Sequence, residues 1–398
     1  MKLFGVFILL ASLLMPQYLV QAQEAAFSAE AEVAFGRQIE FIGEYRGSAD
    51  LVSAMLFYQV EGLPETYEGE AEIALDGRIH YLLDVTHRPI RAFSMVKYWF
   101  ELVTAAGETF SSPSFFVYYE DDRFEWRERD TARFRVHWYA GNTRFAQDVL
   151  DVAELGFQSA QNLLSFSLNQ PVDIYVYASA QEMRAALQSF SQSWVGAHAD
   201  PDLGVMVLSL PAGPEQRLEM ERQIPHELMH ILLYQKLGAG YANLPAWLNE
   251  GLASTAELYP NPDYLILMEN AQRKGSLPAV QSLCRTFPKD ASGAFLAYAQ
   301  SASFTRYLHQ RFGSSGMERL VQRYADGLEC EKGVVAALGI PLSQLELEWR
   351  VEVLGENVYR TALVNLLPWL FFLAVVLIIP IGIALMGRRN RPFSTQIG

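Results

Sequence analysis

A pair of histidines followed by a more distant glutamate is the feature that most constrains this fold. The chain reads His-Glu-Leu-Met-His over residues 226–230, and Glu250 follows after a spacer of 19 residues. On a helix, residues i and i+4 lie on one face, so His226 and His230 can direct their imidazole nitrogens at one point. Glu227 is placed beside them, and Glu250, on a later helix, can add a carboxylate oxygen. The pattern predicts a site for one metal ion with three protein ligands and one open position.

The sequence around the motif is typical of a helix. Residues 231–234 continue an apolar helical face, and Pro225 suits the first turn of a helix. The short histidine pattern also occurs by chance, and Glu250 has an alternative role as a surface carboxylate in a first turn, where Asn249 could cap the helix. We expect metal ligation by His226, His230 and Glu250, because the three groups occur together at a spacing that suits one ion.

The motif and its spacing resemble the signature of a known group of peptidases. Residues 226–230 and the run Trp-Leu-Asn-Glu-Gly-Leu-Ala at 247–253 are similar to the gluzincin pattern HExxH…NEGxA of thermolysin-like and aminopeptidase N-type enzymes. The family called peptidase MA-like is the most similar, over about residues 134–359. The resemblance implies an α+β thermolysin/gluzincin-like metallopeptidase domain that acts on a peptide or protein substrate. It also implies one zinc ion, with His226, His230 and Glu250 as its ligands.

The resemblance also implies a mechanism. Zinc polarises the scissile carbonyl and makes water acidic, and Glu227 takes the proton from that water as general base and later passes it to the leaving amine. In aminopeptidase N-type enzymes, the tyrosine of a Tyr-x-Lys-Gly motif stabilises the oxyanion. Here residues 298–301 read Tyr-Ala-Gln-Ser. Tyr298 is therefore either the catalytic oxyanion donor or a half-buried helix residue with its hydroxyl at the surface.

A ligand histidine usually donates its second N–H to a carboxylate or a carbonyl. Glu257 follows Glu250 at position i+7, on the same face of a helix, and is our candidate for that acceptor. Its alternative is an ordinary solvated acid at a helix end.

Both ends of the chain carry apolar runs. Residues 3–15 follow Met1 and Lys2 and lead into small residues, which predicts a secretory signal peptide over residues 1–22. Residues 361–387 are almost entirely apolar and precede a basic tail at 388–398, which predicts one transmembrane helix in contact with the lipid bilayer. A cleaved lipid-anchor tail is the alternative. We expect a single-pass protein of the cell membrane with extracytoplasmic (periplasmic or extracellular) domains and a cytoplasmic tail.

Cysteine content and charge bear on disulfide formation and on the kind of partner. Cys284 and Cys330 are the only cysteines; in an oxidising compartment they can form one disulfide, and two separate buried thiols are the alternative. The net charge of −14 argues against a nucleic-acid partner, because that binding requires basic patches. The sequence carries no signal for an oligomeric state.

The apolar periodicity divides the chain into two folded units. Up to about residue 124 the period is two, and Asp76-Gly77 is a hairpin signal between two such runs. This predicts an all-β immunoglobulin/fibronectin III-like sandwich over residues 23–128, with aromatics such as Trp99 and Tyr119 in its core.

Beyond that unit, strands and helices alternate, which predicts the peptidase domain over residues 129–360. The strand at 204–210 precedes the histidine motif. Its residues 204–207 are either an edge strand that pairs with extended substrate or an interior strand of the sheet. The other predicted strands are 134–138 and 172–177, and the predicted helices are 145–164, 181–190, 294–312, 317–324 and 342–353.

These features predict a membrane-anchored extracytoplasmic zinc metallopeptidase. The alternative is a catalytically inactive binding or scaffold protein that retains the fold, although a degenerate enzyme usually loses the base or a ligand, and this chain keeps all four groups. A structural zinc site is disfavoured because such sites are closed by four ligands, commonly cysteines, and neither cysteine lies near the motif.

Overall fold

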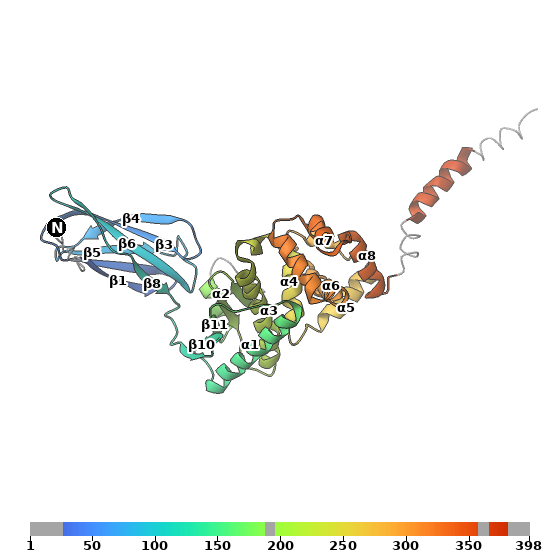
Figure 1. Ribbon diagram of the computed structural model, residues 1–398, viewed down its shortest axis with the longest axis horizontal. Coiled ribbons are helices and arrows are strands. Elements are labelled where there is room, and N and C mark those ends of the chain that lie inside the picture. The colour runs from blue at the N-terminus through green and yellow to red at the C-terminus, as the bar shows by residue number, and fades with distance from the viewer. Residues whose placement is uncertain (1–26, 188–195, 357–365, 381–398) are drawn as a thin grey trace, which may run out of the picture. The chain divides into compact units, whose positions relative to one another are not determined.

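The computed structural model describes residues 27–187, 196–356 and 366–380 of the chain. The chain divides into two compact units, residues 1–123 and 124–398 (Figure 1). The predicted domain boundary at residue 128 falls inside a strand, Arg127–Asp130, that pairs within the second unit. The predicted signal peptide at 1–22 and the predicted tail at 388–398 lie outside the described residues.

The first unit is all-β, as the alternating pattern predicts. Its sheet order is β1-β2-β5-β4-β3-β6-β7, and β8 also pairs with β6. Phe27 and Phe41, from β1 and β2, have ring centroids 5.3 and 4.8 Å from those of Phe100 and Tyr98 on β6. The strands therefore form two facing layers, and β4 pairs with a strand of each. The strands are β1 (Phe27–Ala34), β2 (Gln38–Tyr45), β3 (Leu51–Val60), β4 (Thr66–Ile73), β5 (Arg78–Asp84), β6 (Ser94–Thr104), β7 (Thr109–Ser111) and β8 (Phe115–Tyr119).

Two expectations about side chains in this unit have different outcomes. The hairpin is confirmed, and Gly77 between β4 and β5 has a φ of 85°, which glycine adopts readily. The prediction that Trp99 fills the core was wrong. Tyr98 and Phe100 are buried, and because successive side chains of a strand face opposite sides, Trp99 lies on the outer face, where it stacks on Phe57 at 5.5 Å.

The second unit contains a five-stranded mixed sheet in the order β12-β13-β11-β10-β9. β10, β11 and β13 are parallel, and antiparallel strands close both edges. Because β13 pairs with both β11 and β12, residues 205–207 lie in an interior strand, so of the two alternatives the interior strand is confirmed and the edge strand was wrong. The edge on this side is β12, whose sequence Ala-His-Ala-Asp gives no apolar strand signal. The strands are β9 (Arg127–Asp130), β10 (Phe134–Trp138), β11 (Val172–Tyr177), β12 (Ala197–Asp200) and β13 (Val205–Ser209).

Helices supply most of the second unit (Figure 1). α1 packs on α3, and α4 packs on both α3 and α6. The predicted helices at 294–312 and 317–324 form α6, which is interrupted at Gly313, where φ is 63° and ψ is −179°. The helices are α1 (Thr143–Leu163), α2 (Ala180–Leu187), α3 (Gln216–Leu237), α4 (Ala246–Ala256), α5 (Asp263–Lys274), α6 (Ala291–Ala325), α7 (Cys330–Leu338) and α8 (Leu342–Glu352), with 3-10 turns η1 (Gly238–Asn243) and η2 (Val280–Leu283).

The prediction of one transmembrane helix at residues 361–387 was wrong. Over the ranges that the structure describes, no helix is both long and apolar enough to cross a membrane. Apolar composition identifies a candidate segment, and a sufficient length of helix is a separate requirement.

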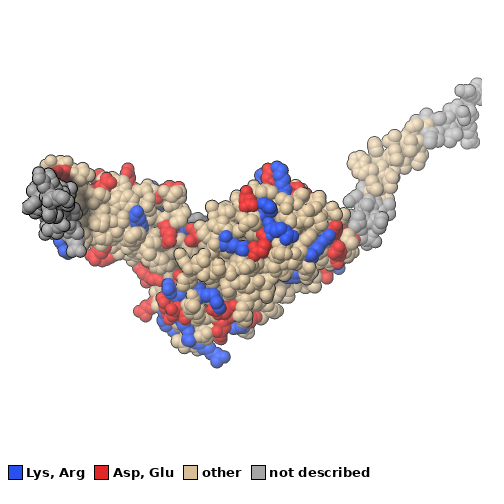
Figure 2. Space-filling model, viewed as in Figure 1, with Lys and Arg blue, Asp and Glu red and all other residues tan. Residues whose placement is uncertain are grey.

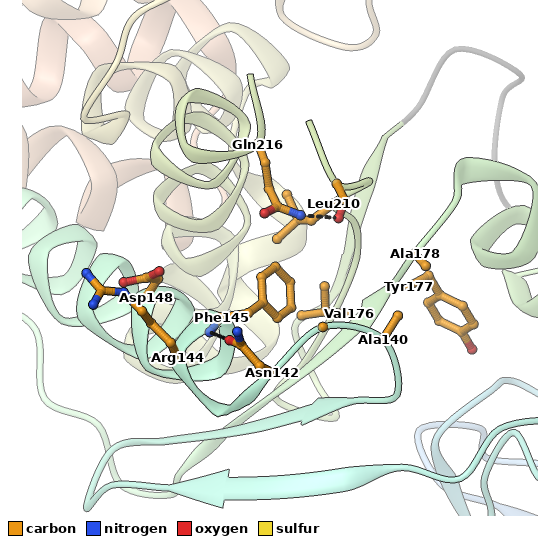
Figure 3. A pocket seen from close by; sticks show the side chains of 12 residues that line it. Ala140, Asn142, Arg144, Phe145, Asp148, Val176, Tyr177, Ala178, Leu210 and Gln216 are labelled. Carbon is orange, nitrogen blue, oxygen red and sulfur yellow. Dashed lines mark hydrogen bonds between the residues drawn. The ribbon is translucent and has the colours of Figure 1, made fainter. Parts of the chain in front are cut away.

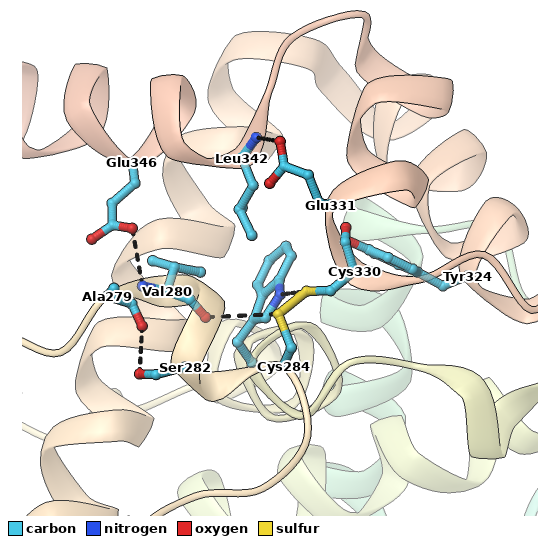
Figure 4. The surroundings of a disulfide bond; sticks show 10 residues. Ala279, Val280, Ser282, Cys284, Tyr324, Cys330, Glu331, Leu342 and Glu346 are labelled. Atoms are coloured by element: carbon cyan, nitrogen blue, oxygen red, sulfur yellow. Dashed lines mark hydrogen bonds between the residues drawn. A yellow bond between two sulfur atoms is a disulfide. The ribbon is translucent and has the colours of Figure 1, made fainter.

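A disulfide joins Cys284 and Cys330, whose sulfur atoms are bonded across a sequence separation of 46 residues. Figure 4 shows the bond between Cys284 and Cys330, with Val280 and Tyr324 nearby. The indole of Trp247 donates a hydrogen bond to Cys330 Sγ at 3.4 Å, and Ala246 N donates to the carbonyl of Cys284 at 3.1 Å. In the chain-entropy model, closing such a loop stabilises the fold by about 4 kcal/mol. The bond therefore holds the first turn of α4 in place.

Charged side chains of the second unit pair with one another over its helical surface. Lys236 lies 3.0 Å from Glu318, and Arg350 lies 2.7 Å from Glu346. In the face that Figure 2 shows, Lys and Arg side chains lie among Asp and Glu side chains. Where such pairs face solvent, each contributes little to stability.

Candidate metal centre

α3 presents the histidine motif. His226 and His230 share one face of this helix, while the intervening Leu228 and Met229 are fully buried in the core. Pro225 does not lie in the first turn, as we had expected, because α3 begins at Gln216 and encloses the proline. The local sequence was misleading because proline at a helix start is the commoner case. The helix is thus anchored by its core face and offers both imidazoles on the other.

Three potential ligand atoms converge between α3 and α4. Glu250 Oε2 lies 3.4 Å from His226 Nε2 and 3.7 Å from His230 Nε2. One ligand atom from each of the three residues lies within 4.8 Å of the others. Glu250 Oε2 is buried and has no hydrogen-bond partner in the part of the chain that the structure describes. A buried carboxylate oxygen is costly unless something satisfies it, and a cation beside the two imidazoles would do so. The geometry therefore fits one metal ion.

The other imidazole nitrogens are held by hydrogen bonds. His226 Nδ1 donates to Glu257 Oε1 at 3.0 Å, and the Glu257 side chain is only 2% exposed. His230 Nδ1 donates to Asn249 Oδ1 at 3.2 Å. These bonds leave the Nε2 atoms free to coordinate and fix each ring. The predicted contact of Glu257 with a histidine of the motif is confirmed.

Asn249 and Tyr241 hold His230, and the sequence did not reveal either role. Asn249 Nδ2 donates to the hydroxyl oxygen of Tyr241 at 3.1 Å, and that oxygen lies 3.3 Å from His230 Nδ1. Asn249 directly precedes Glu250, so its place beside the site could have been inferred. Tyr241 lies in η1 and carries no motif that marks it.

A cavity of about 260 Å³ lies beside His226. His226, Glu227 and Tyr298 are among its lining residues. Tyr298 lies on α6, with its ring centroid 6.1 Å from that of His226. Burial, followed by the charges of Glu250 and Glu227, raises the pKa of Tyr298 well above its ordinary value. Its hydroxyl therefore stays protonated and can act as a donor.

The carboxylates around His226 determine its charge. Burial alone lowers the pKa of His226, but Glu250, Glu257 and Glu227 together raise it well above its ordinary value. Burial likewise raises the pKa of Glu250, but the two histidines reverse this and lower it. These opposite shifts favour the charged form of both side chains, His226 as a cation and Glu250 as an anion.

The edge strand β12 borders the same cavity. Ala197, its first residue, lines the cavity together with Gly196. β12 pairs with β13 on one side only, because it ends the order of the described sheet. The strand at residues 205–209, β13, is therefore interior, and its neighbour β12 forms the sheet edge beside the cavity.

A separate cavity of about 360 Å³ lies where β10, β11 and β13 end and α1 and α3 begin. Figure 3 shows Phe145 and Gln216 in this cavity, with Asn142 capping α1. None of the candidate metal ligands lines it. Of the two cavities, only the one that His226 and Glu227 line is next to the converging ligand atoms.

A helix with the His-Glu-x-x-His pattern and a second helix with a converging carboxylate, beside a mixed sheet, define a zinc-peptidase-like domain. The family model described as Peptidase MA superfamily matches residues 154–355, just over half of the chain. The protein belongs to the peptidase MA superfamily. No curated protein sequence matches the chain closely enough to serve as a relative.

Solved structures of M1 zinc metallopeptidases are also similar to this chain. A mutant M1 zinc metallopeptidase from Deinococcus radiodurans is 12% identical, with 83% of this chain and 94% of that one covered and a TM-score of 0.35. An aminopeptidase N family protein from Idiomarina loihiensis is 9% identical, with 84% and 75% covered and a TM-score of 0.34. At these scores the family assignment rests on the family model.

Proposed function

We propose that the protein is a zinc-dependent peptidase that acts outside the cytoplasm. The convergence of His226 Nε2, His230 Nε2 and the unsatisfied Glu250 Oε2 carries this proposal. Two imidazoles and one carboxylate are a common ligand set of catalytic zinc, which keeps a further position open for reaction. The family supports the same reaction class.

Glu227 and Tyr298 are the proposed catalytic residues. When bound, zinc supplies Lewis acidity, which polarises the scissile carbonyl and makes water a nucleophile near neutral pH. Glu227 lines the cavity beside His226, where its carboxylate can take the proton from water and return it to the leaving amine. Tyr298 can donate a hydrogen bond to the carbonyl oxygen as negative charge develops there. Glu257 and Asn249 keep the two imidazoles oriented throughout.

The proposed substrate is a peptide or protein segment that reaches the cavity beside His226 and Glu227. Membership of the peptidase MA superfamily supports a peptide substrate. Action outside the cytoplasm is supported by the Cys284–Cys330 disulfide, because such bonds persist in oxidising compartments.

A peptide-library assay tests the proposed function. The purified full-length chain is expected to contain one zinc ion and to cleave some members of a diverse peptide library. Removal of zinc with a chelator should stop cleavage, and added zinc should restore it, because the ligands belong to this chain. The positions of the cuts would separate aminopeptidase from endopeptidase action. Zinc binding without any hydrolysis would contradict the proposal and favour a binding or scaffold protein.

The affinity for zinc is expected to rise with pH. The pKa of His226 is raised in the metal-free protein, so below that pKa zinc must displace a proton, and the apparent affinity should rise by up to about tenfold per pH unit. The metal-free fold should lose stability over the same rise, because a histidine with a raised pKa stabilises the fold only while it remains protonated. Competition with a chelator of known affinity, between about pH 5.5 and 8, measures this effect. An affinity that does not change with pH would contradict it.

A further inference from the structure

Pro225 lies inside α3 although proline is the residue least compatible with a helix interior. In a regular helix, the N–H of residue 225 would donate to the carbonyl of Glu221. Proline has no N–H, so that carbonyl needs another donor. It receives two from outside the helix: Leu258 N at 2.9 Å and Tyr259 N at 3.4 Å.

These two donors directly follow the residue that holds His226. α4 ends at Ala256, and Glu257 leaves the helix with a φ of −53° and a ψ of 133°. The bond from Leu258 N to the Glu221 carbonyl therefore ties the chain next to Glu257 to α3. From there, the Glu257 carboxylate reaches His226 Nδ1, also on α3, at 3.0 Å.

The helix on the other side of α3 leaves room for the proline ring. Gly156 of α1 faces Pro225, and a Cβ added at Gly156 would lie 3.1 Å from the Cα, Cβ and Cγ atoms of the proline. The contact is close, so the glycine and the proline fit each other. The ring of Pro225 is therefore buried against α1 rather than exposed to solvent.

We propose that Pro225 is a positioning residue for the metal centre. By removing one helical N–H, it frees the Glu221 carbonyl to capture Leu258 N–H, and this capture holds Glu257 against His226. With alanine at this position, the restored N–H would compete for the same carbonyl. The segment after α4 would then be held less tightly, and Glu257 would orient His226 less well. The proposal rests on the metal site of the proposed function but not on hydrolysis.

Pro225→Ala tests whether Pro225 holds Glu257 against His226. The amides of Leu258 and Tyr259 are expected to exchange hydrogen faster than in the wild type, measured in the metal-free protein. Zinc affinity is expected to fall by up to about 10- to 100-fold, the range for loss of a group that orients a ligand. The melting temperature should stay the same or rise, because alanine favours a helix interior. A purely structural proline would change the melting temperature without changing zinc affinity.

Two further variants make the test specific. Pro341→Ala is the matched control: Pro341 lies at the N-terminal cap of α8, away from the site, and this variant should leave zinc affinity unchanged. In a Glu257→Gln background, Pro225→Ala should cause little further loss of zinc affinity, because its effect passes through Glu257. Unchanged exchange at Leu258 in Pro225→Ala, or equal losses of affinity in both backgrounds, would overturn the proposal. Absence of peptide cleavage by the wild type would count against the proposed function alone.

Discussion

Glu227→Gln is expected to lower kcat/KM for peptide hydrolysis by about 10²- to 10⁴-fold, the usual contribution of a general base. The amide of glutamine keeps the size of the side chain but cannot accept the proton. Glu227 lines the cavity beside His226 and is not one of the three converging ligand groups. Zinc content should therefore remain at one ion per chain. Steady-state kinetics on a peptide from the library, with zinc measured in the same preparation, checks both parts.

A matched substitution on the same helix separates loss of the base from general damage. Glu215, at the N-terminal cap of α3, is exposed and does not line the cavity. Glu215→Gln removes one carboxylate from the start of this helix and should leave the rate nearly unchanged. If Glu227→Gln hydrolysed peptide at the wild-type rate, Glu227 would not be the base.

Glu250→Ala is expected to weaken zinc binding by more than the roughly 100-fold upper range for residues that only orient ligands. The variant loses an oxygen that lies within 3.7 Å of both imidazole nitrogens. Two histidines would remain, and a catalytic site usually needs three protein ligands. Hydrolysis should fall with zinc occupancy. Equilibrium competition against a chelator of known affinity gives the change in zinc affinity directly.

The conservative variant Glu250→Asp serves as the comparison. It keeps a carboxylate on a shorter stem, so its zinc affinity should lie between those of the wild type and Glu250→Ala. A thermal melt of each metal-free variant would show that the fold is retained. Unchanged zinc affinity in Glu250→Ala would remove Glu250 from the set of ligands.

Helical periodicity explains why the centre of the site could be predicted. The spacing of His226 and His230 sets their common face, whatever surrounds the helix. Glu257 was predicted because it follows Glu250 along the chain and because ligand histidines need an acceptor. These inferences use only the spacing of residues along one or two helices, and that spacing is read directly from the sequence.

Contacts between elements that are distant in sequence were harder to predict. Tyr241 reaches His230 from a 3-10 turn, and nothing in the local sequence marks that contact. β12 is short and half polar, so its position at the sheet edge depends on pairing with β13 rather than on its own pattern. Pro225 was assigned to a helix start because the sequence cannot show that a donor from another segment satisfies Glu221.

The prediction for residues 361–387 was wrong for another reason. Hydropathy measures how apolar a segment is, but crossing a bilayer also requires one continuous helix of sufficient length.

In the first unit, the same two-residue period that revealed strands also fixed which residues face inward. Trp99 was nevertheless placed in the core because aromatic residues usually fill sandwich cores, and its register between Tyr98 and Phe100 was not used.

The disulfide beside α4 affects how this protein must be handled in the laboratory. Trp247 contacts Cys330, and Glu250 lies one turn further along the same helix, so the bond braces the helix that carries a ligand. Material made in a reducing host, or kept in buffers with thiol reagents, would lose that brace. Thiols also bind zinc, so such buffers would remove metal at the same time. An inactive preparation of this kind would reflect its redox history rather than the chemistry of its active site.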